Sequence, residues 1–174
     1  STILSGSVIR LSKRKILVQQ LYCIEALARV DTLCLDKTGT ITDGGMKVVN
    51  IHQVGPETEG NVAQILYTLV CATKDENGTA KAIRKAYSKF HELEYTSAVP
   101  FNSSTKYSAV NLTDGRTIVL GAKEFLHIES KELDELVYDH ESRGLRTLVI
   151  ALSNIPVESG VELKKLQPLG VLVL

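Results

Sequence analysis

The 174-residue sequence predicts an α+β fold, in which an antiparallel β-sheet is flanked by helices and preceded by a short N-terminal piece of α/β structure. Two observations predict it. From residue 46 onward, short apolar runs bounded by turn signals alternate with amphipathic stretches of helical spacing. Ahead of them one apolar run, Thr32–Leu35, ends in Asp36 and is typical of a buried parallel strand.

The first 30 residues predict a helix that follows a basic cluster. Four apolar residues recur at spacings of four, three and four, which places them on one helical face: Leu17, Leu21, Ile24 and Ala28. The basic cluster before them consists of Arg10, Lys13, Arg14 and Lys15. It is either a solvated helix end or a juxtamembrane segment that follows a membrane helix upstream.

The rest of the chain predicts five strands and three helices. The expected strands are residues 47–54, 106–112, 116–120, 148–152 and 169–174, with an Asp114-Gly115 hairpin turn between the second and third. The expected helices start at the caps Asn61, Thr79 and Ser130, and Gly144 ends the third. From about Met46 onward, these elements predict an antiparallel sheet with helices packed on it.

Composition excludes several classes of protein. Lys plus Arg and Asp plus Glu both number 20, so bulk charge gives no case for a nucleic-acid partner. Cys23, Cys34 and Cys71 lack metal-ligand spacing and are expected to be buried free thiols. The sequence has no apolar stretch long enough to cross a bilayer.

The strongest functional signal follows the predicted strand directly. Asp36 is followed by Lys37, Thr38, Gly39 and Thr40, which offer a cation, two hydroxyls and a sharp turn. A carboxylate at the carboxyl end of a parallel strand lies in the crevice where open α/β sheets bind ligands. The alternative is a purely structural role, in which Asp36 caps a turn and Lys37 is a solvated charge. The unbroken DKTGT pentad, followed by Ile-Thr, resembles the phosphorylation motif of P-type ATPases, the ion pumps that form an aspartyl-phosphate.

This resemblance implies a role for each residue of the pentad and a division of the chain. Asp36 would be the phosphorylated nucleophile, residues 37–40 its catalytic loop, and Asp36 and the main chain of Thr38 ligands of Mg²⁺. Residues 1–30 would be a stalk or linker helix. Residues 31–45 would be the first strand and phosphorylation loop of the HAD-like phosphorylation domain, and residues 46–174 the nucleotide-binding domain.

A second group of residues resembles the nucleotide pocket of the same family. Phe101 and Lys106 stand as in the family's Phe-Ser-x-x-x-Lys element, and Ser103 lies between them. The resemblance implies that Phe101 stacks on adenine and that Lys106 lines the pocket, which suits a π-face and a mobile cation. Taken alone, the two residues are better explained as a core aromatic and a solvated strand lysine.

Three further stretches extend this resemblance. Gly121-Ala122 matches part of a Lys-Gly-Ala-Pro-Glu element, although Leu120 and Lys123 replace its lysine and proline. Arg146 stands where the family's Gly-x-Arg arginine contacts nucleotide phosphates. Glu76, in a turn before a helix, is a further candidate near adenine.

The whole pattern implies an ATP-binding cytosolic fragment of a cation-transporting P-type ATPase, with ATP and Mg²⁺ as cofactors. The parent is expected to hydrolyse ATP, to transport Ca²⁺ or Mg²⁺, and to lie in a bacterial cell membrane with this part on the cytoplasmic side. The fragment alone is expected to be inactive. Two alternatives remain open. One is a soluble phosphatase or phosphotransferase of the HAD superfamily, although Thr38 replaces the second Asp of its Asp-x-Asp motif. The other is a noncatalytic nucleotide-binding module.

Overall fold

The chain divides into two compact units, Ser1–Gly44 and Gly45–Leu174. The structure is a computed structural model, and it describes residues 2–36, 40–41, 45–158, 163 and 165–174. Within those residues no helix has the length and apolar character that a membrane crossing requires.

The first unit contains two helices, α1 (Thr2–Lys13) and α2 (Tyr22–Leu27). The helix expected from Ile16 is wrong in length, since only its six central residues are helical. Lys15 adopts a left-handed φ of 62° two residues after α1 ends, and residues 16–18 have no regular structure. α1 ends in the basic cluster, with Arg10 and Lys13 in its last turn, where cations complement the helix dipole.

The strand expected at Thr32–Leu35 is not formed. Residues 30–36 have no regular structure, and the side chains of Leu33 and Leu35 are 73% and 54% exposed. A β-strand needs neighbouring strands for its hydrogen bonds and for burial of its apolar face, and the described residues of this unit include no second strand. The local sequence carries the strand pattern, but no sheet is present here to complete it.

The second unit is built on a six-stranded antiparallel sheet with the order β1-β6-β5-β4-β3-β2. This confirms the predicted antiparallel sheet. The strands are β1 (Asn50–Gln53), β2 (Tyr95–Val99), β3 (Tyr107–Leu112), β4 (Thr117–Gly121), β5 (Thr147–Ser153) and β6 (Gln167–Val173).

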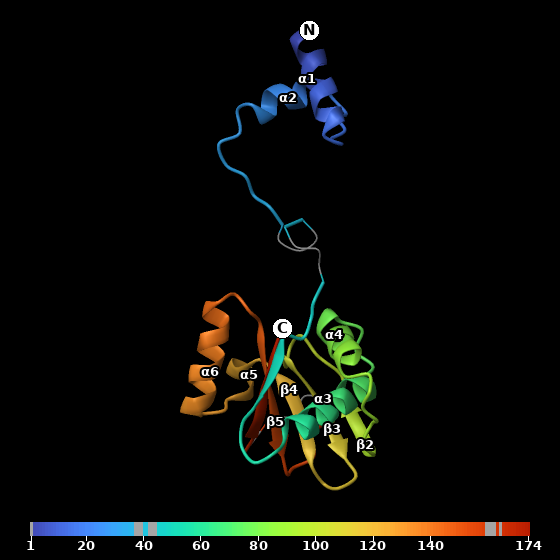
Figure 1. Cartoon of the computed structure of the whole chain (residues 1–174), viewed down its shortest axis with the longest axis vertical. Coiled ribbons are helices and arrows are strands. Elements are labelled where there is room, and N and C mark those ends of the chain that lie inside the picture. The colour runs from blue at the N-terminus through green and yellow to red at the C-terminus, as the bar shows by residue number, and fades with distance from the viewer. Residues whose placement is uncertain (1, 37–39, 42–44, 159–162, 164) are drawn as a thin grey trace. The chain divides into compact units, whose positions relative to one another are not determined.

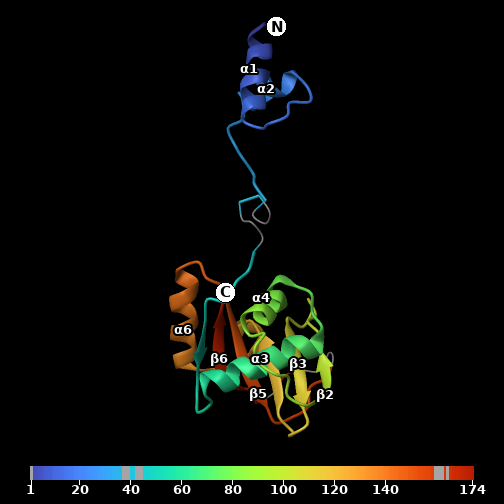
Figure 2. The ribbon, with the colours of Figure 1, turned by 45° about the vertical axis from the view of Figure 1, so that its right-hand side comes forward.

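Helices cover both faces of this sheet, as Figures 1 and 2 show. α3 (Glu59–Thr73) and α4 (Gly78–Ala86) lie on one face, and α5 (Lys123–Leu126) and α6 (Lys131–Ser142) lie on the other. Successive strand residues point to opposite faces, so β4 sends Ile118 and Leu120 into the core beneath α3 and sends Val119 into the core beneath α6. The sheet is therefore buried on both sides.

Several local expectations are confirmed. Ser130 caps α6 by accepting a hydrogen bond from the Leu133 N–H. Gly115 adopts φ 87° in the turn between β3 and β4, and Gly144 adopts φ 79° after α6. Such left-handed values favour glycine because it has no Cβ.

Other expectations are wrong in detail. α3 is capped by Thr58 in place of Asn61, and α4 by Asn77 in place of Thr79, because each helix starts earlier than its apolar pattern suggests. β2 and α5 have no counterpart in the prediction. Pro168 lies inside β6 and not before it, and the pairing of β6 with β5 shifts register beside it, between Ile150 and Ala151. Proline within sheets is found at such irregularities.

The cysteines also differ from expectation. All three are free, as expected, but Cys34 is exposed and Cys23 and Cys71 are only partly buried.

Candidate functional site

The second unit contains a cavity of about 480 Å³ beside one end of the central strands. Its walls come from the start of β3, the end of β4, the start of β5, the first turn of α4, α5 and the loop between β2 and β3. Antiparallel neighbours place the end of one strand beside the start of the next, so these segments meet although they are distant in sequence. A volume of this size is typical of small-molecule sites.

Five of the seven residues predicted to bind nucleotide line this cavity: Phe101, Lys106, Gly121, Ala122 and Arg146. Glu76 and Ser103 do not line it. Glu76 is exposed and forms ion pairs with Lys81 at 3.5 Å and Arg84 at 3.4 Å. Ser103 is exposed in the loop before β3. The structure therefore gathers the aromatic, glycine and cationic candidates and leaves these two outside.

Two phenylalanine rings, from different elements, line the cavity. Phe101 belongs to the loop between β2 and β3 and is 46% exposed, so it is not the core aromatic of the alternative interpretation. Phe125 on α5 is 42% exposed and was not singled out from the sequence. Each ring is accessible to a flat ligand, which can stack on an aromatic face.

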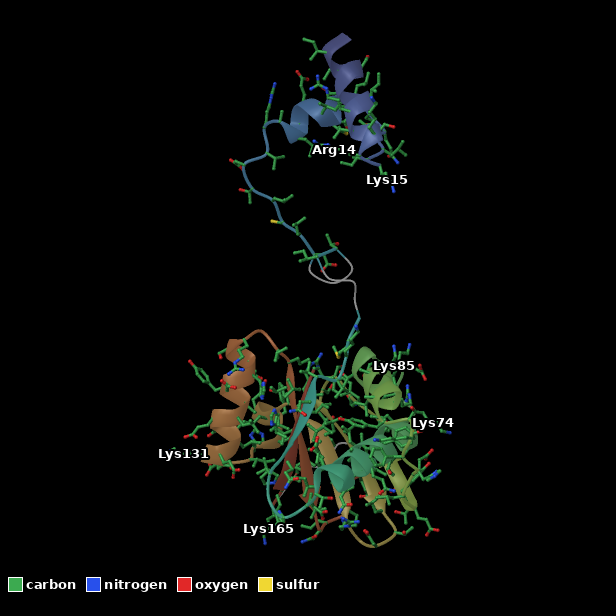
Figure 3. All side chains as sticks on the ribbon, viewed as in Figure 1. Arg14, Lys15, Lys74, Lys85, Lys131 and Lys165 are labelled. Atoms are coloured by element: carbon green, nitrogen blue, oxygen red, sulfur yellow. The ribbon has the colours of Figure 1, made fainter. Side chains whose placement is uncertain are left out.

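The two cations of the cavity, Lys106 and Arg146, form no ion pair in the described part of the chain. Lys106 has φ 63° immediately before β3, and its N–H donates to the Asn102 carbonyl at 2.7 Å. The backbone of Arg146 pairs with Leu174 in both directions, which fixes it beside β6. By contrast Lys74, Lys85 and Lys131, labelled in Figure 3, are exposed and lie outside the lining.

Gly121 is required by the protein's own packing. A Cβ at this position would lie 3.0 Å from Leu126 Cδ2 and 3.1 Å from the Lys106 carbonyl oxygen. The segments that approach Gly121 closely are α5 and the start of the neighbouring strand β3. Leu120 is only 6% exposed and faces the core beneath α3 while also lining the cavity.

Acidic groups also line the cavity: Asp75, Glu124 and Glu141. Glu141 on α6 accepts a hydrogen bond of 2.6 Å from the Thr147 hydroxyl, next to Arg146 in sequence. Asp75 accepts hydrogen bonds from the backbone N–H of Phe101. The acidic groups therefore hold the protein's own donors within the site.

Several lining residues were missed by the sequence analysis. Asn77 caps α4 through the Ala80 N–H at 2.9 Å, and the Thr79 hydroxyl donates to the Met46 sulfur at 3.2 Å. Of the Asp-Glu-Asn turn, only Glu76 is a candidate from the sequence, whereas its neighbours Asp75 and Asn77 line the cavity. An Asn directly before a helical stretch is a capping signal that would have found Asn77. No local signal marks Phe125, Glu141 or Met46.

The phosphorylation motif lies in the first unit and only part of it is described. Asp36 and Thr40 are exposed. Lys37, Thr38 and Gly39 lie outside the described residues. Among those that are described, no group of three His, Cys, Asp or Glu side chains could hold a metal.

Sequence comparison finds relatives among bacterial cation-transporting ATPases. The chain is 43% identical over 155 residues to a probable cation-transporting ATPase, exp7, of Streptococcus pneumoniae, covering 87% of this chain and 19% of that protein. It is 33% identical over 168 residues to the calcium-transporting ATPase CtpE of Mycobacterium bovis, covering 96% of this chain and 21% of that protein. The chain thus spans about a fifth of the length of the curated relatives it matches. No protein-family model matches it.

Solved structures with the same fold belong to the same class. The N-domain of HMA8, a copper-transporting P-type ATPase, matches with a TM-score of 0.51 at 14% identity, over 73% of this chain and 98% of that domain. A zinc-transporting PIB-type ATPase matches with a TM-score of 0.63 at 17% identity, over 98% of this chain and 25% of that protein. These likenesses show the fold.

Proposed function

Because this chain is homologous to P-type cation-transporting ATPases and its second unit has the fold of their N-domains, we propose that its cavity binds ATP. Residues 46–174 would form the nucleotide-binding domain of such a pump. The observation that carries the proposal is the cavity itself. It is of nucleotide size and brings an accessible aromatic ring together with two cations that form no ion pair among the described residues.

Each group has a distinct task in this proposal. Adenine would stack on the ring of Phe101, since a purine offers a π-face to an aromatic side chain. The phosphates would extend toward Lys106 and Arg146. A guanidinium presents a fork of donors to phosphate oxygens, and lysine adds a mobile point charge. Ala122, whose side chain is small, would leave the main chain close to the ligand between these two ends, and Gly121 would make room for the packing of α5 beside it.

In the whole protein, Asp36 would be the acceptor of the phosphoryl group. A carboxylate oxygen of Asp36 attacks the γ-phosphorus in line, the bond from that phosphorus to the bridging oxygen breaks, and ADP leaves with the bonding electrons. Water later attacks the phosphorus of the acyl phosphate, the bond from that phosphorus to the Asp36 oxygen breaks, and inorganic phosphate leaves as the carboxylate is restored. Lys37, Thr38, Gly39 and Thr40 would shape the loop that receives the phosphoryl group, with the lysine countering its charge.

The donor chemistry of this loop suits Mg²⁺. Mg²⁺ sites of this kind use one or two carboxylates together with substrate phosphates and water. Asp36 would supply a carboxylate oxygen, and the main chain of Thr38 a second oxygen. When bound, the ion would neutralise the negative charge that develops on the transferring group.

For the whole protein we propose transport of a divalent cation, Ca²⁺ or Mg²⁺, with this part on the cytoplasmic side of the membrane. The name of the 33%-identical relative CtpE, a calcium-transporting ATPase, supports Ca²⁺. ATP-driven uptake of labelled Ca²⁺ into vesicles that contain the full-length protein would test this. Uptake of Mg²⁺ in its place would select the other ion.

The alternatives have less support. Thr38 stands where HAD-superfamily phosphatases usually carry the second Asp of their motif, and an aspartyl-phosphate without that general acid persists longer. The named relatives are all transporters, so the comparison supports neither the phosphatase nor the noncatalytic module as the function of this chain.

The decisive experiment is an ATP titration of the chain by NMR or calorimetry, with three aromatic variants compared. Phe101→Ala should weaken ATP binding by about 1–3 kcal/mol, the cost of one lost base stack. Phe125→Ala is the matched variant inside the cavity, and Tyr138→Ala removes an exposed ring that lies outside it. Loss of ATP binding in Phe125→Ala alone would indicate that adenine stacks on Phe125 of α5 and not on Phe101. No ATP binding by the unaltered chain would refute the proposal.

A further inference from the structure

The backbone of Phe101 is held by a carboxylate from a distant turn. The N–H of Phe101 donates to Asp75 Oδ1 at 3.3 Å and to Asp75 Oδ2 at 3.1 Å, a contact between residues 26 apart in sequence. Hydrogen bonds from a backbone N–H to an ionised carboxylate are stronger than neutral ones. This contact therefore ties the loop between β2 and β3 to the turn between α3 and α4.

The turn that carries Asp75 is itself fixed by Arg84 of α4. The Nη2 group of Arg84 donates to the Asp75 carbonyl oxygen at 2.6 Å, and its Nη1 group donates to the Val70 carbonyl oxygen at 2.9 Å. Lys74, at φ 55°, reverses the chain between these two acceptors. The end of α3, the turn and α4 are thus cross-linked by one guanidinium, and Asp75 projects from a rigid support.

The charge of Asp75 is unfavourable for an anionic ligand, so its presence in the lining needs a reason. A carboxylate within the same cavity as triphosphate repels it, at a cost that grows as water is excluded. A benefit elsewhere must offset this repulsion. Holding an exposed loop residue in its binding position lowers the conformational entropy lost when a ligand binds. The contact with Phe101 supplies that benefit.

We propose that Asp75 is a positioning residue of the cavity, which fixes the main chain at Phe101 and so presents its ring to the base of a bound nucleotide. The proposal rests on the proposed function as an ATP-binding domain. Asp75 itself makes no contact with the base in this account and acts through Phe101.

Four single variants and one double mutant test this. Asp75→Ala should weaken ATP binding about three- to tenfold, the range expected for loss of one hydrogen bond. Asp75→Asn retains an acceptor oxygen and should recover most of the affinity. Glu92→Ala removes an exposed carboxylate outside the lining and should leave affinity unchanged. In a Phe101→Ala background, Asp75→Ala should cause no further loss, because no ring remains to be positioned.

Additivity would overturn the proposal. If Asp75→Ala weakens ATP binding equally with and without the Phe101 ring, the carboxylate contacts the ligand directly. Unchanged ATP affinity in Asp75→Ala would also overturn the proposal, because it would show that Asp75 does not position Phe101 for binding.

A measurement without nucleotide separates this proposal from the proposed function. Amide hydrogen exchange at Phe101 should accelerate in Asp75→Ala and return toward the original rate in Asp75→Asn, while exchange in the core strands β4 and β5 stays unchanged. Equal exchange rates of the Phe101 amide in the unaltered chain, Asp75→Ala and Asp75→Asn would refute the proposal that Asp75 holds this loop. If the unaltered chain fails to bind ATP, the proposed function is wrong, and the exchange rates still decide whether Asp75 holds the loop.

Discussion

At the scale of single residues, Arg146 can be compared with a matched arginine three positions earlier. Arg146 lines the cavity without an ion pair in the described chain, whereas Arg143 bonds Asp139 at 2.7 Å outside it. We expect Arg146→Ala to weaken ATP binding about tenfold, since hydrogen bonds to charged groups contribute roughly 1.5–3 kcal/mol, and to leave adenosine binding unchanged. Arg143→Ala makes the same charge change and should affect neither ligand. Calorimetry with both ligands checks this, and a parallel loss of adenosine would contradict the phosphate role.

Gly121 gives a second prediction at this scale. A methyl group at Gly121 would lie 3.0 Å from the Leu126 side chain and 3.1 Å from the Lys106 carbonyl oxygen, which is closer than ordinary van der Waals contact. Gly121→Ala should therefore lower the free energy of unfolding by about 1–3 kcal/mol, the usual cost of overpacking. Gly60→Ala, where a Cβ meets nothing within 4 Å, is the matched control. Denaturant unfolding measures the free energy of unfolding of both variants. Equal stability of the two would show that α5 shifts to accommodate the added methyl group.

At the scale of elements, the start of α4 forms one wall of the cavity, so its cap affects the site. Asn77 accepts a hydrogen bond from the Ala80 N–H, while the Thr79 hydroxyl donates to Met46. We expect Asn77→Ala to lower the free energy of unfolding by about 1 kcal/mol, as loss of an N-cap does. Thr79→Ala should cost less, because its partner is a weak sulfur acceptor. Thermal unfolding of the two variants distinguishes them. A larger loss of stability in Thr79→Ala than in Asn77→Ala would indicate that Thr79 is the N-cap.

At the scale of the whole molecule, the cavity and the phosphorylation motif belong to different units. Every residue that lines the cavity lies at or after Met46, and Asp36 lies before Gly44. We expect Asp36→Asn to leave the ATP affinity unchanged, and we expect no stable phosphoenzyme from this chain. Phosphoryl transfer needs nucleophile, metal and γ-phosphate held together, and the described residues offer no cluster of metal ligands.

Incubation with ATP labelled in the γ-phosphate, with Mg²⁺, checks this expectation. An acid-stable label that hydroxylamine removes, and that Asp36→Asn abolishes, would show that the motif assembles in this chain. Weaker ATP binding in Asp36→Asn would show that the first unit takes part in the nucleotide site.

The sequence alone determined the fold class and five of the residues that line the cavity. Short apolar runs bounded by turn residues define strands β3 to β6 without reference to distant partners, and the Asp-Gly turn and Ser130 cap are local chemistry. The candidates Phe101, Lys106, Gly121, Ala122 and Arg146 came from short motifs, and the structure places them around one cavity. These residues could be predicted because each belongs to a motif that a few neighbouring residues are enough to recognise.

Only the tertiary structure decided the rest. The segment 32–35 has a strand pattern but remains exposed, because hydrogen bonding and burial of a strand depend on neighbours that local sequence does not supply. Glu76 and Asp75 are adjacent carboxylates in one turn, and local sequence does not distinguish them. The fold turns Asp75 toward the N–H of a residue 26 positions away and leaves Glu76 exposed among surface cations. Long-range pairing of this kind arises from packing of elements, so it has no signature in the residues that precede or follow it.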